Sequence, residues 1–185
     1  MLQYDELAAA RAVELLGFGK LNLQLARYWL SQWENGAPPL RGAIKPRQVK
    51  RLLPGIAILE MRSDRSVICR LAGSALAMGV GIDPTGKDVI ALTPPEFRAA
   101  RLARYCRVLD GAVSRCVKPL QTRFGTVVLV EDIQLPLGGV GEDGARQILY
   151  HADWRPQTLD RSTAELADGF ATTIDESYPI VRAAA

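Results

Sequence analysis

The segment from residue 56 to residue 154 carries strand and helix patterns in an order that few folds accommodate. Two short apolar runs, at 56–61 and 67–71, flank a polar turn and predict a β-hairpin. Residues 73–81 predict a short helix or turn, and residues 95–110 predict a helix with proline in its first turn. Strand patterns at 113–122, 126–137 and 145–154 follow. This order predicts an α+β fold, in which helices of the crossover cover one face of a five-stranded antiparallel sheet.

Two helices are predicted before the hairpin. The first spans residues 5–16, and the second spans residues 21–34, where Leu21, Leu25, Trp29 and Trp33 recur every four residues. Asn35-Gly36 ends this second helix. We therefore predict a helical extension at 1–36, a central domain at 37–155 and a C-terminal tail at 156–185. In the tail, a capping-box pattern at 162–165 predicts one more short helix, and residues beyond 168 predict a poorly ordered end.

The amino-acid composition narrows the classes of function that this chain can have. The chain of 185 residues is 48% apolar and has a net charge of +3, which is ordinary globular usage and argues against a dedicated nucleic-acid-binding module. The three cysteines form no Cys-x-x-Cys pair, so neither a disulfide framework nor a thiolate metal site is indicated. No signal-peptide pattern and no long apolar span are present, and we expect a cytoplasmic protein without a membrane segment.

Several short motifs occur in a recognisable order: Leu25-Ala26-Arg27-Tyr28-Trp29, Leu52-Leu53-Pro54, Ile58-Leu59-Glu60, Arg70-Leu71-Ala72-Gly73-Ser74-Ala75-Leu76 and Asp83-Pro84-Thr85-Gly86-Lys87. With them the chain resembles the stand-alone bacterial PAS proteins, over about residues 21 to 154. Ser74 departs from the family pattern, which has threonine there. The resemblance implies a sensory or protein-interaction module with a pocket between the sheet and the crossover helices, and it supplies no catalytic residues.

A ligand pocket of this kind is expected to be lined by apolar and thiol side chains. Facing patterns select Ile58, Cys69, Leu76, Met78, Leu102, Cys106 and Val128. The cofactor, if there is one, stays unknown, because the sequence contains no flavin or haem motif that can be mapped. His151, the single histidine, is interpreted as a hydrogen-bonded structural residue rather than a ligand or an acid/base group.

Charged residues offer two further hypotheses. Arg70 ends an apolar strand, which predicts either a salt bridge to Asp83 or Asp88 that locks the strand to the crossover, or a ligand contact. Arginines recur every three residues on the 95–110 helix, opposite the predicted apolar face formed by Leu102, Cys106 and Leu109. This row predicts either a solvated face or a site for an acidic partner or a phosphate-bearing ligand.

The apolar stripe of the 21–34 helix covers about half of its circumference, which is more than packing on one domain needs. We predict a homodimer with Leu25, Trp29 and Trp33 at the interface; the alternative is a monomer whose N-terminal helices cover the free face of the sheet. Three functions compete: a sensory module that binds a small ligand and an unidentified signalling protein, a ligand-free adaptor, and an enzyme. We expect no enzyme, because paired carboxylates, metal clusters and nucleophile motifs are lacking.

Overall fold

The computed structural model describes residues 2–121, 127–141, 143–155 and 174–181. Within these residues, six strands form one antiparallel sheet in the order β2-β1-β5-β4-β3-β6. They are β1 (Ile56–Met61), β2 (Val67–Ala72), β3 (Ala112–Gln121), β4 (Val127–Pro136), β5 (Arg146–Arg155) and β6 (Ile174–Pro179). The predicted hairpin and the three strands after the crossover are confirmed.

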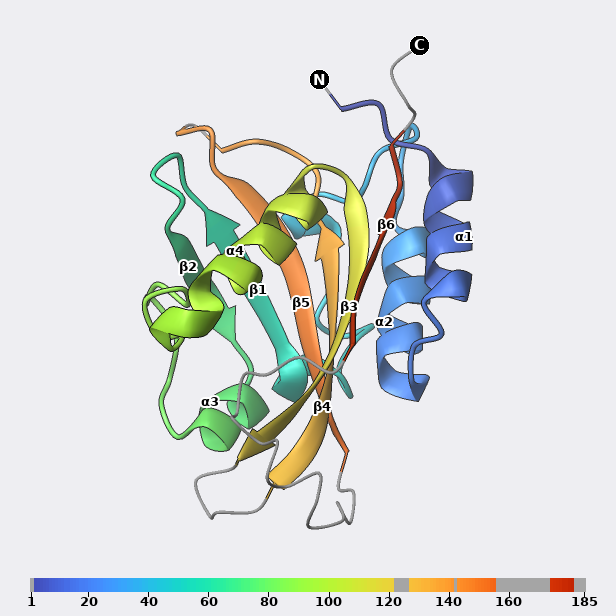
Figure 1. Cartoon of the computed structure of the whole chain (residues 1–185). Coiled ribbons are helices and arrows are strands. Elements are labelled where there is room, and N and C mark those ends of the chain that lie inside the picture. The colour runs from blue at the N-terminus through green and yellow to red at the C-terminus, as the bar shows by residue number, and fades with distance from the viewer. Residues whose placement is uncertain (1, 122–126, 142, 156–173, 182–185) are drawn as a thin grey trace.

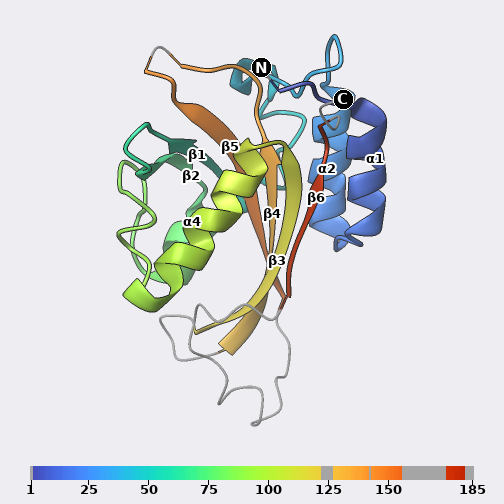
Figure 2. The ribbon, with the colours of Figure 1, turned by 45° about the horizontal axis from the view of Figure 1, so that its top comes forward.

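Helices cover both faces of the sheet, as Figures 1 and 2 show. On one face lie α1 (Glu6–Leu15) and α2 (Lys20–Ser31), and on the other lie α3 (Ser74–Val80) and α4 (Pro95–Leu109). The side chain of Asp5 caps α1 by accepting a hydrogen bond from the Ala8 backbone N–H. No helix in the described part of the chain has both the length and the apolarity needed to cross a membrane.

The sixth strand corrects the prediction of a five-stranded sheet and of a poorly ordered end beyond residue 168. Strand β6 pairs with β3 from Ala112 to Val117 and forms the edge of the sheet. Its sequence Ile-Asp-Glu-Ser-Tyr-Pro is polar, so the strand is fixed by long-range contacts rather than by a local apolar pattern. The predicted short helix at 162–165 lies outside the described residues.

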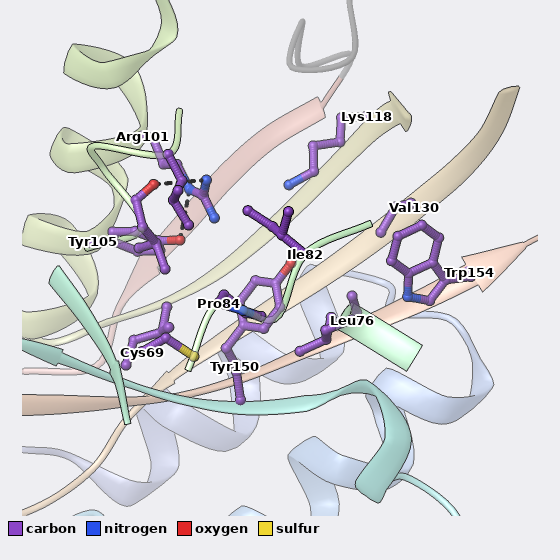
Figure 3. A pocket seen from close by; sticks show the side chains of 15 residues that line it. Cys69, Leu76, Ile82, Pro84, Arg101, Tyr105, Lys118, Val130, Tyr150 and Trp154 are labelled. Atoms are coloured by element: carbon purple, nitrogen blue, oxygen red, sulfur yellow. Dashed lines mark hydrogen bonds between the residues drawn. The ribbon is translucent and has the colours of Figure 1, made fainter. Parts of the chain in front are cut away.

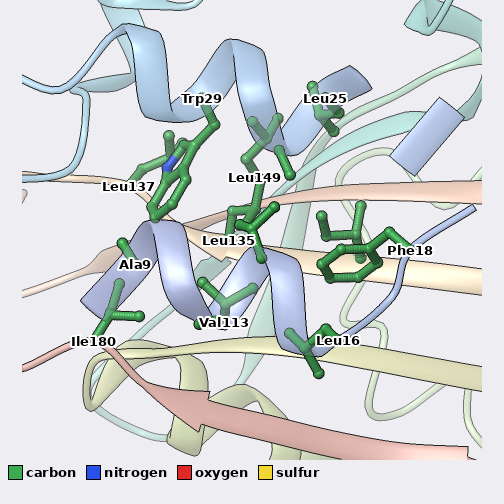
Figure 4. Close-up of a cluster of buried hydrophobic side chains, with 14 of the residues drawn as sticks. Ala9, Leu16, Phe18, Leu25, Trp29, Val113, Leu135, Leu137, Leu149 and Ile180 are labelled. Carbon is green, nitrogen blue, oxygen red and sulfur yellow. The ribbon is translucent and has the colours of Figure 1, made fainter. Parts of the chain in front are cut away.

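The first core lies between α1, α2 and the sheet (Figure 4). The Trp29 side chain is completely buried, and its indole N–H donates to the Pro136 carbonyl oxygen at 2.9 Å. Trp29 and Trp33 meet edge to face with ring centroids 5.1 Å apart. Leu25 is likewise buried in this core. The assignment of Leu25, Trp29 and Trp33 to a subunit interface is therefore wrong: these side chains cover the free face of their own sheet.

The second core lies between the opposite face of the sheet and the helices α3 and α4. Its α4 face differs from the predicted one. The buried α4 residues are Arg104, Tyr105, Val108 and Leu109, whereas Leu102 and Cys106 are only partly buried. The helix is rotated so that two arginines of the predicted row, Arg101 and Arg104, point toward the sheet. This rotation is stable because both guanidinium groups find hydrogen-bond partners there.

Candidate ligand pocket

A cavity of about 130 Å³ opens in the second core, between the sheet, α3 and α4. Side chains from every strand of the sheet except the edge strand β6 contribute to its wall. It is lined by Ala57, Leu59, Cys69, Leu76, Ile82, Pro84, Val89, Leu92, Arg101, Tyr105, Lys118, Val130, Tyr150, Ala152 and Trp154. Figure 3 shows Arg101 and Tyr105 at one end of this cavity and Val130 and Trp154 at the other.

Two of the predicted lining residues, Cys69 and Leu76, lie in the cavity wall. Ile58 faces the opposite core, beneath the N-terminal helices, because consecutive strand residues point to opposite faces and Leu59 takes the cavity side. Met78 is 62% exposed on the outer side of α3.

The remaining predicted residues, Leu102, Cys106 and Val128, pack against the second core without lining the cavity. The rotation of α4 explains the first two, since it brings Arg101 and Tyr105 to the places where Leu102 and Cys106 were expected. Val128 lies on the same strand as Val130, but two residues nearer the end of the sheet.

A buried polar chain borders the cavity. The Tyr150 hydroxyl donates to Oδ1 of Asp132 at 2.6 Å, and the Lys118 ammonium donates to Oδ2 of the same carboxylate at 2.6 Å. Burial raises the pKa of Tyr150 well above its usual value, and the charge of Asp132 adds to the effect. Tyr150 therefore remains a neutral hydrogen-bond donor at physiological pH. Sequence reasoning missed this chain, although Glu131-Asp132 inside the apolar run Val127–Pro136 was a visible signal.

Arg101 supplies a cation to the cavity without a carboxylate partner. Its Nε donates to the Tyr105 hydroxyl at 2.9 Å, and Nη1 donates to the Thr93 hydroxyl at 2.8 Å. The guanidinium also lies over the Tyr105 ring, 5.6 Å from its centroid. Within the described residues, Arg101 forms no ion pair, and its Nη2 has no hydrogen-bond partner.

Trp154 closes the other end of the cavity. Its indole N–H is buried and donates to no group in the part of the chain that the structure describes. The ring lies directly beneath Gly79 of α3, where a Cβ atom would come within 2.1 Å of the indole. Glycine at this position therefore allows α3 to rest on the tryptophan face.

A second cavity, of about 150 Å³, adjoins the first and shares Arg101 and Lys118 with it. Arg104, also in its wall, forms a bidentate pair with Asp175 of β6, both contacts measuring 3.0 Å. Arg107 donates to the same carboxylate at 2.9 Å. Burial alone would raise the pKa of Asp175, but these guanidinium groups lower it below its usual value. Part of the predicted arginine row thus holds the edge strand, and part lines the two cavities.

The opposite face of the sheet carries a separate buried network around Glu131. Its Oε2 accepts from the Gly19 N–H at 2.8 Å and from the Asn22 side-chain amide at 2.9 Å, and its Oε1 accepts from Arg115 at 2.8 Å. Nδ1 of His151 lies 2.6 Å from the Asn22 side-chain oxygen, which can only accept, so this nitrogen carries the proton. His151 is thus a buried, hydrogen-bonded residue, as predicted. The network joins the start of α2 to β4 and β5.

The predicted lock between Arg70 and Asp83 is wrong. Arg70 is exposed on the edge strand β2 and approaches Glu60 at 3.8 Å. Asp83 instead accepts from the Thr85 backbone N–H at 2.9 Å and stabilises a local turn. Asp88, the other predicted partner, accepts from the backbone N–H groups of Val67 and Ile90 and so joins β2 to the crossover without an arginine.

The described residues of this pocket do not favour thiol or metal chemistry. Burial raises the pKa of Cys69, and its thiol donates to the Leu71 carbonyl oxygen at 3.2 Å. The side chain is therefore a neutral apolar group rather than a nucleophile. Among the described residues, histidine, cysteine and carboxylate side chains form no group suited to hold a metal ion.

No curated protein matches the sequence. Among solved structures, the chain is similar to the protein in a crystal structure of the Vibrio cholera VqmA-ligand-DNA complex, with 14% sequence identity and a TM-score of 0.38. That similarity covers 71% of this chain and 62% of the other. A family model described as PAS domain matches residues 20–146, from the first residue of α2 to the first residue of β5. The chain belongs to the PAS domain family.

Proposed function

We propose that this PAS domain is a non-catalytic sensory module that binds a small organic ligand in the cavity between the sheet and α4. The observation that carries the proposal is the cavity wall itself. Apolar side chains such as Leu76 and Val130 surround three convergent polar groups, Arg101, Lys118 and Tyr150. An apolar cavity with a few fixed polar groups is the usual form of a small-molecule site.

The titratable side chains in and near the cavity suit ligand binding better than catalysis. Tyr150 and Cys69 are held in their neutral forms by burial, and His151 lies on the other face of the sheet. A general base or nucleophile needs a pKa near neutrality and access to the substrate. We therefore propose no reaction for this site and assign these residues to ligand recognition and packing.

The route by which occupancy is sensed is proposed to cross the sheet. Tyr150 lines the cavity and donates to Asp132, while their neighbours Glu131 and His151 contact the start of α2 on the other face. A ligand that moves Asp132 or Tyr150 therefore acts on β4 and β5 at the points where α2 is held. We propose that the N-terminal helices pass this change to a partner protein, and that the module works in the cytoplasm.

Filling the cavity tests the proposal. Leu76→Trp places a large side chain in the cavity, whereas Met78→Trp makes the same kind of change on the exposed side of the same helix. Native mass spectrometry of the freshly purified proteins reports a retained small molecule. We expect a bound mass in the wild type and in Met78→Trp, and its loss in Leu76→Trp. A small molecule retained equally by all three proteins would contradict the proposed site.

A ligand-free adaptor is the second candidate, and the volume of the cavity favours it. Drug-sized ligands occupy pockets of roughly 300–1,000 Å³, and this cavity measures about 130 Å³. In that case no mass is retained, metabolite mixtures do not raise the melting temperature, and Leu76→Trp alters stability but not partner binding.

The homodimer remains part of the proposal, although Leu25, Trp29 and Trp33 cannot form its interface. The outer side of α1 exposes Leu7 and Leu15, one turn to either side of Arg11. Exposed apolar side chains of this kind are common at contacts between subunits. Sedimentation of the full chain tests the dimer, and Leu7→Glu combined with Leu15→Glu is expected to give monomers.

A further inference from the structure

The boundary between the two cavities carries an excess of positive charge. Three cations, Arg101, Arg104 and Lys118, line the second cavity. Two carboxylates accompany them: Asp175 pairs with Arg104, and Asp132 pairs with Lys118. Arg101 is the cation left without a carboxylate among the described residues. A guanidinium withdrawn from water is costly unless a counter-charge or good hydrogen bonds accompany it.

The hydrogen bonds of Arg101 fix the orientation of its guanidinium group but do not use all of its N–H donors. Tyr105, Thr93 and the Val89 carbonyl oxygen hold Nε and Nη1. Nη2 keeps its two N–H groups without a partner in the described residues. Lys118 uses one hydrogen bond on Asp132 and has further donors. Both side chains are shared by the two cavities, so the unused donors lie where a ligand in the first cavity can reach them.

On the basis of the ligand-binding function above, we propose that the ligand is a monocarboxylate whose carboxylate lies between Arg101 and Lys118. Its apolar body occupies the first cavity, against Leu76 and Val130. One negative charge matches Arg101, the cation of the cavity walls that has no ion pair among the described residues. A phosphate group carries about two charges at neutral pH, and its second charge would face Asp175 in the wall of the second cavity.

The cavity also limits the body of the ligand. Its volume is about 130 Å³, and an apolar protein cavity of about 150 Å³ holds benzene. The ligand body is therefore a single ring or a short aliphatic chain. Trp154 lies at the end opposite Arg101, so the far side of the ligand packs against this tryptophan.

Isothermal titration calorimetry of the full chain tests the charge preference. The probes are benzoate, phenylacetate and hexanoate, each compared with its primary amide, together with phenyl phosphate. We expect at least one carboxylate to bind about tenfold more tightly than its amide, since a charge-assisted hydrogen bond contributes about that factor. Arg101→Gln should remove this preference, so that the acid and its amide bind with similar affinity. Arg107→Gln is the control, because it removes the same charge from the same helix but lines neither cavity.

The outcomes separate this inference from the proposed function. If acids and amides bind equally, the proposed ligand-binding function stands, but the assignment of the ligand as a carboxylate is overturned. Tighter binding of phenyl phosphate also overturns it. If the Arg101→Gln variant still prefers acids, another residue binds the ligand carboxylate, and the role given to Arg101 is overturned. If Arg101→Gln does not fold, the wild-type comparison of acid and amide decides. Absence of binding for every probe, with no retained mass in the native spectrum, contradicts both the inference and the function.

Discussion

Glu131 and Asp132 are consecutive residues of β4 whose carboxylates serve opposite faces of the sheet. Glu131 accepts hydrogen bonds from Gly19 and Asn22 at the start of α2, and Asp132 accepts them from Tyr150 and Lys118 beside the cavity. Both carboxylates are buried. Because side chains alternate along a strand, a slip of one residue would turn each carboxylate to the opposite face and away from its present hydrogen-bond partners. The pair thus fixes the register of the central strand.

Asn22→Ala is expected to loosen the N-terminal helices from the sheet. The change removes two hydrogen bonds to Glu131, one to its backbone carbonyl oxygen and one to its carboxylate, and leaves the His151 N–H without its acceptor. A buried polar group left unsatisfied costs about 2 kcal/mol. Urea unfolding should report a loss of this size, whereas Gln24→Ala, at an exposed position of the same helix, should have little effect. Equal losses in the two variants would contradict a specific role for Asn22.

His151 predicts a fall in stability at mildly acidic pH. Burial lowers its pKa below the usual 6.5, although the charges of Asp153, Asp132 and Glu131 oppose the shift. The folded state therefore favours neutral imidazole, and the unfolded state takes up the proton first as the pH falls below about 6.5. The free energy of unfolding should be highest above that pH and decline toward pH 5.

Because His151 is the only histidine in the sequence, His151→Gln isolates this effect. Urea midpoints measured between pH 5 and pH 8 (about one and a half units either side of an ordinary histidine pKa) should change less with pH in the variant. The same slope in both proteins would show that carboxylates, and not His151, cause the decline.

Asp175→Asn is expected to release the edge strand. Arg104 is 5% exposed and would lose its counter-charge, while Arg107 would lose the same partner. Because Asp175 is partly exposed, we expect about 2 kcal/mol, below the value for a fully buried pair. Hydrogen exchange should accelerate in β6 and in the paired part of β3. Glu176→Gln, which weakens only a 3.5 Å contact to Arg115, is the control and should exchange like the wild type.

Trp29→Ala is expected to unfold the chain rather than dissociate a dimer. The side chain is fully buried between α2 and the sheet, and its loss should cost about 4 kcal/mol. Arg27→Ala, at an exposed position of the same helix, should leave the melting temperature unchanged. A folded Trp29→Ala protein that sediments as a monomer, where the wild type sediments as a dimer, would restore the interface interpretation.

The order of the elements could be predicted because it depends on local patterns: apolar period, turn residues and proline positions. The face of each residue could not be predicted in the same way. The run Ile56–Leu59 is apolar throughout, because both sides of β1 are buried, so nothing in it distinguishes Ile58 from Leu59. The cavity side was therefore assigned to the wrong one of the two.

The orientation of α4 and the existence of β6 depend on each other across about 70 residues of sequence. Arg104 can point inward because Asp175 lies opposite, and the polar strand around Asp175 is held because Arg104 and Arg107 reach it. Neither segment carries a local signal of this partnership. Considered alone, the helix places its arginines in water, and the tail has no period that indicates a strand.

The close contact between Gly79 and Trp154 means that the residue at position 79 influences the size of ligand that the cavity accepts. An added methyl group there cannot be accommodated beside the indole, so α3 would have to move outward or the tryptophan would have to turn. Either movement changes the shape of the cavity at the end that Trp154 closes, which is the end away from Arg101. Evolution or design could thus change which ligand body this domain accepts through one small residue, and leave recognition of the head group intact.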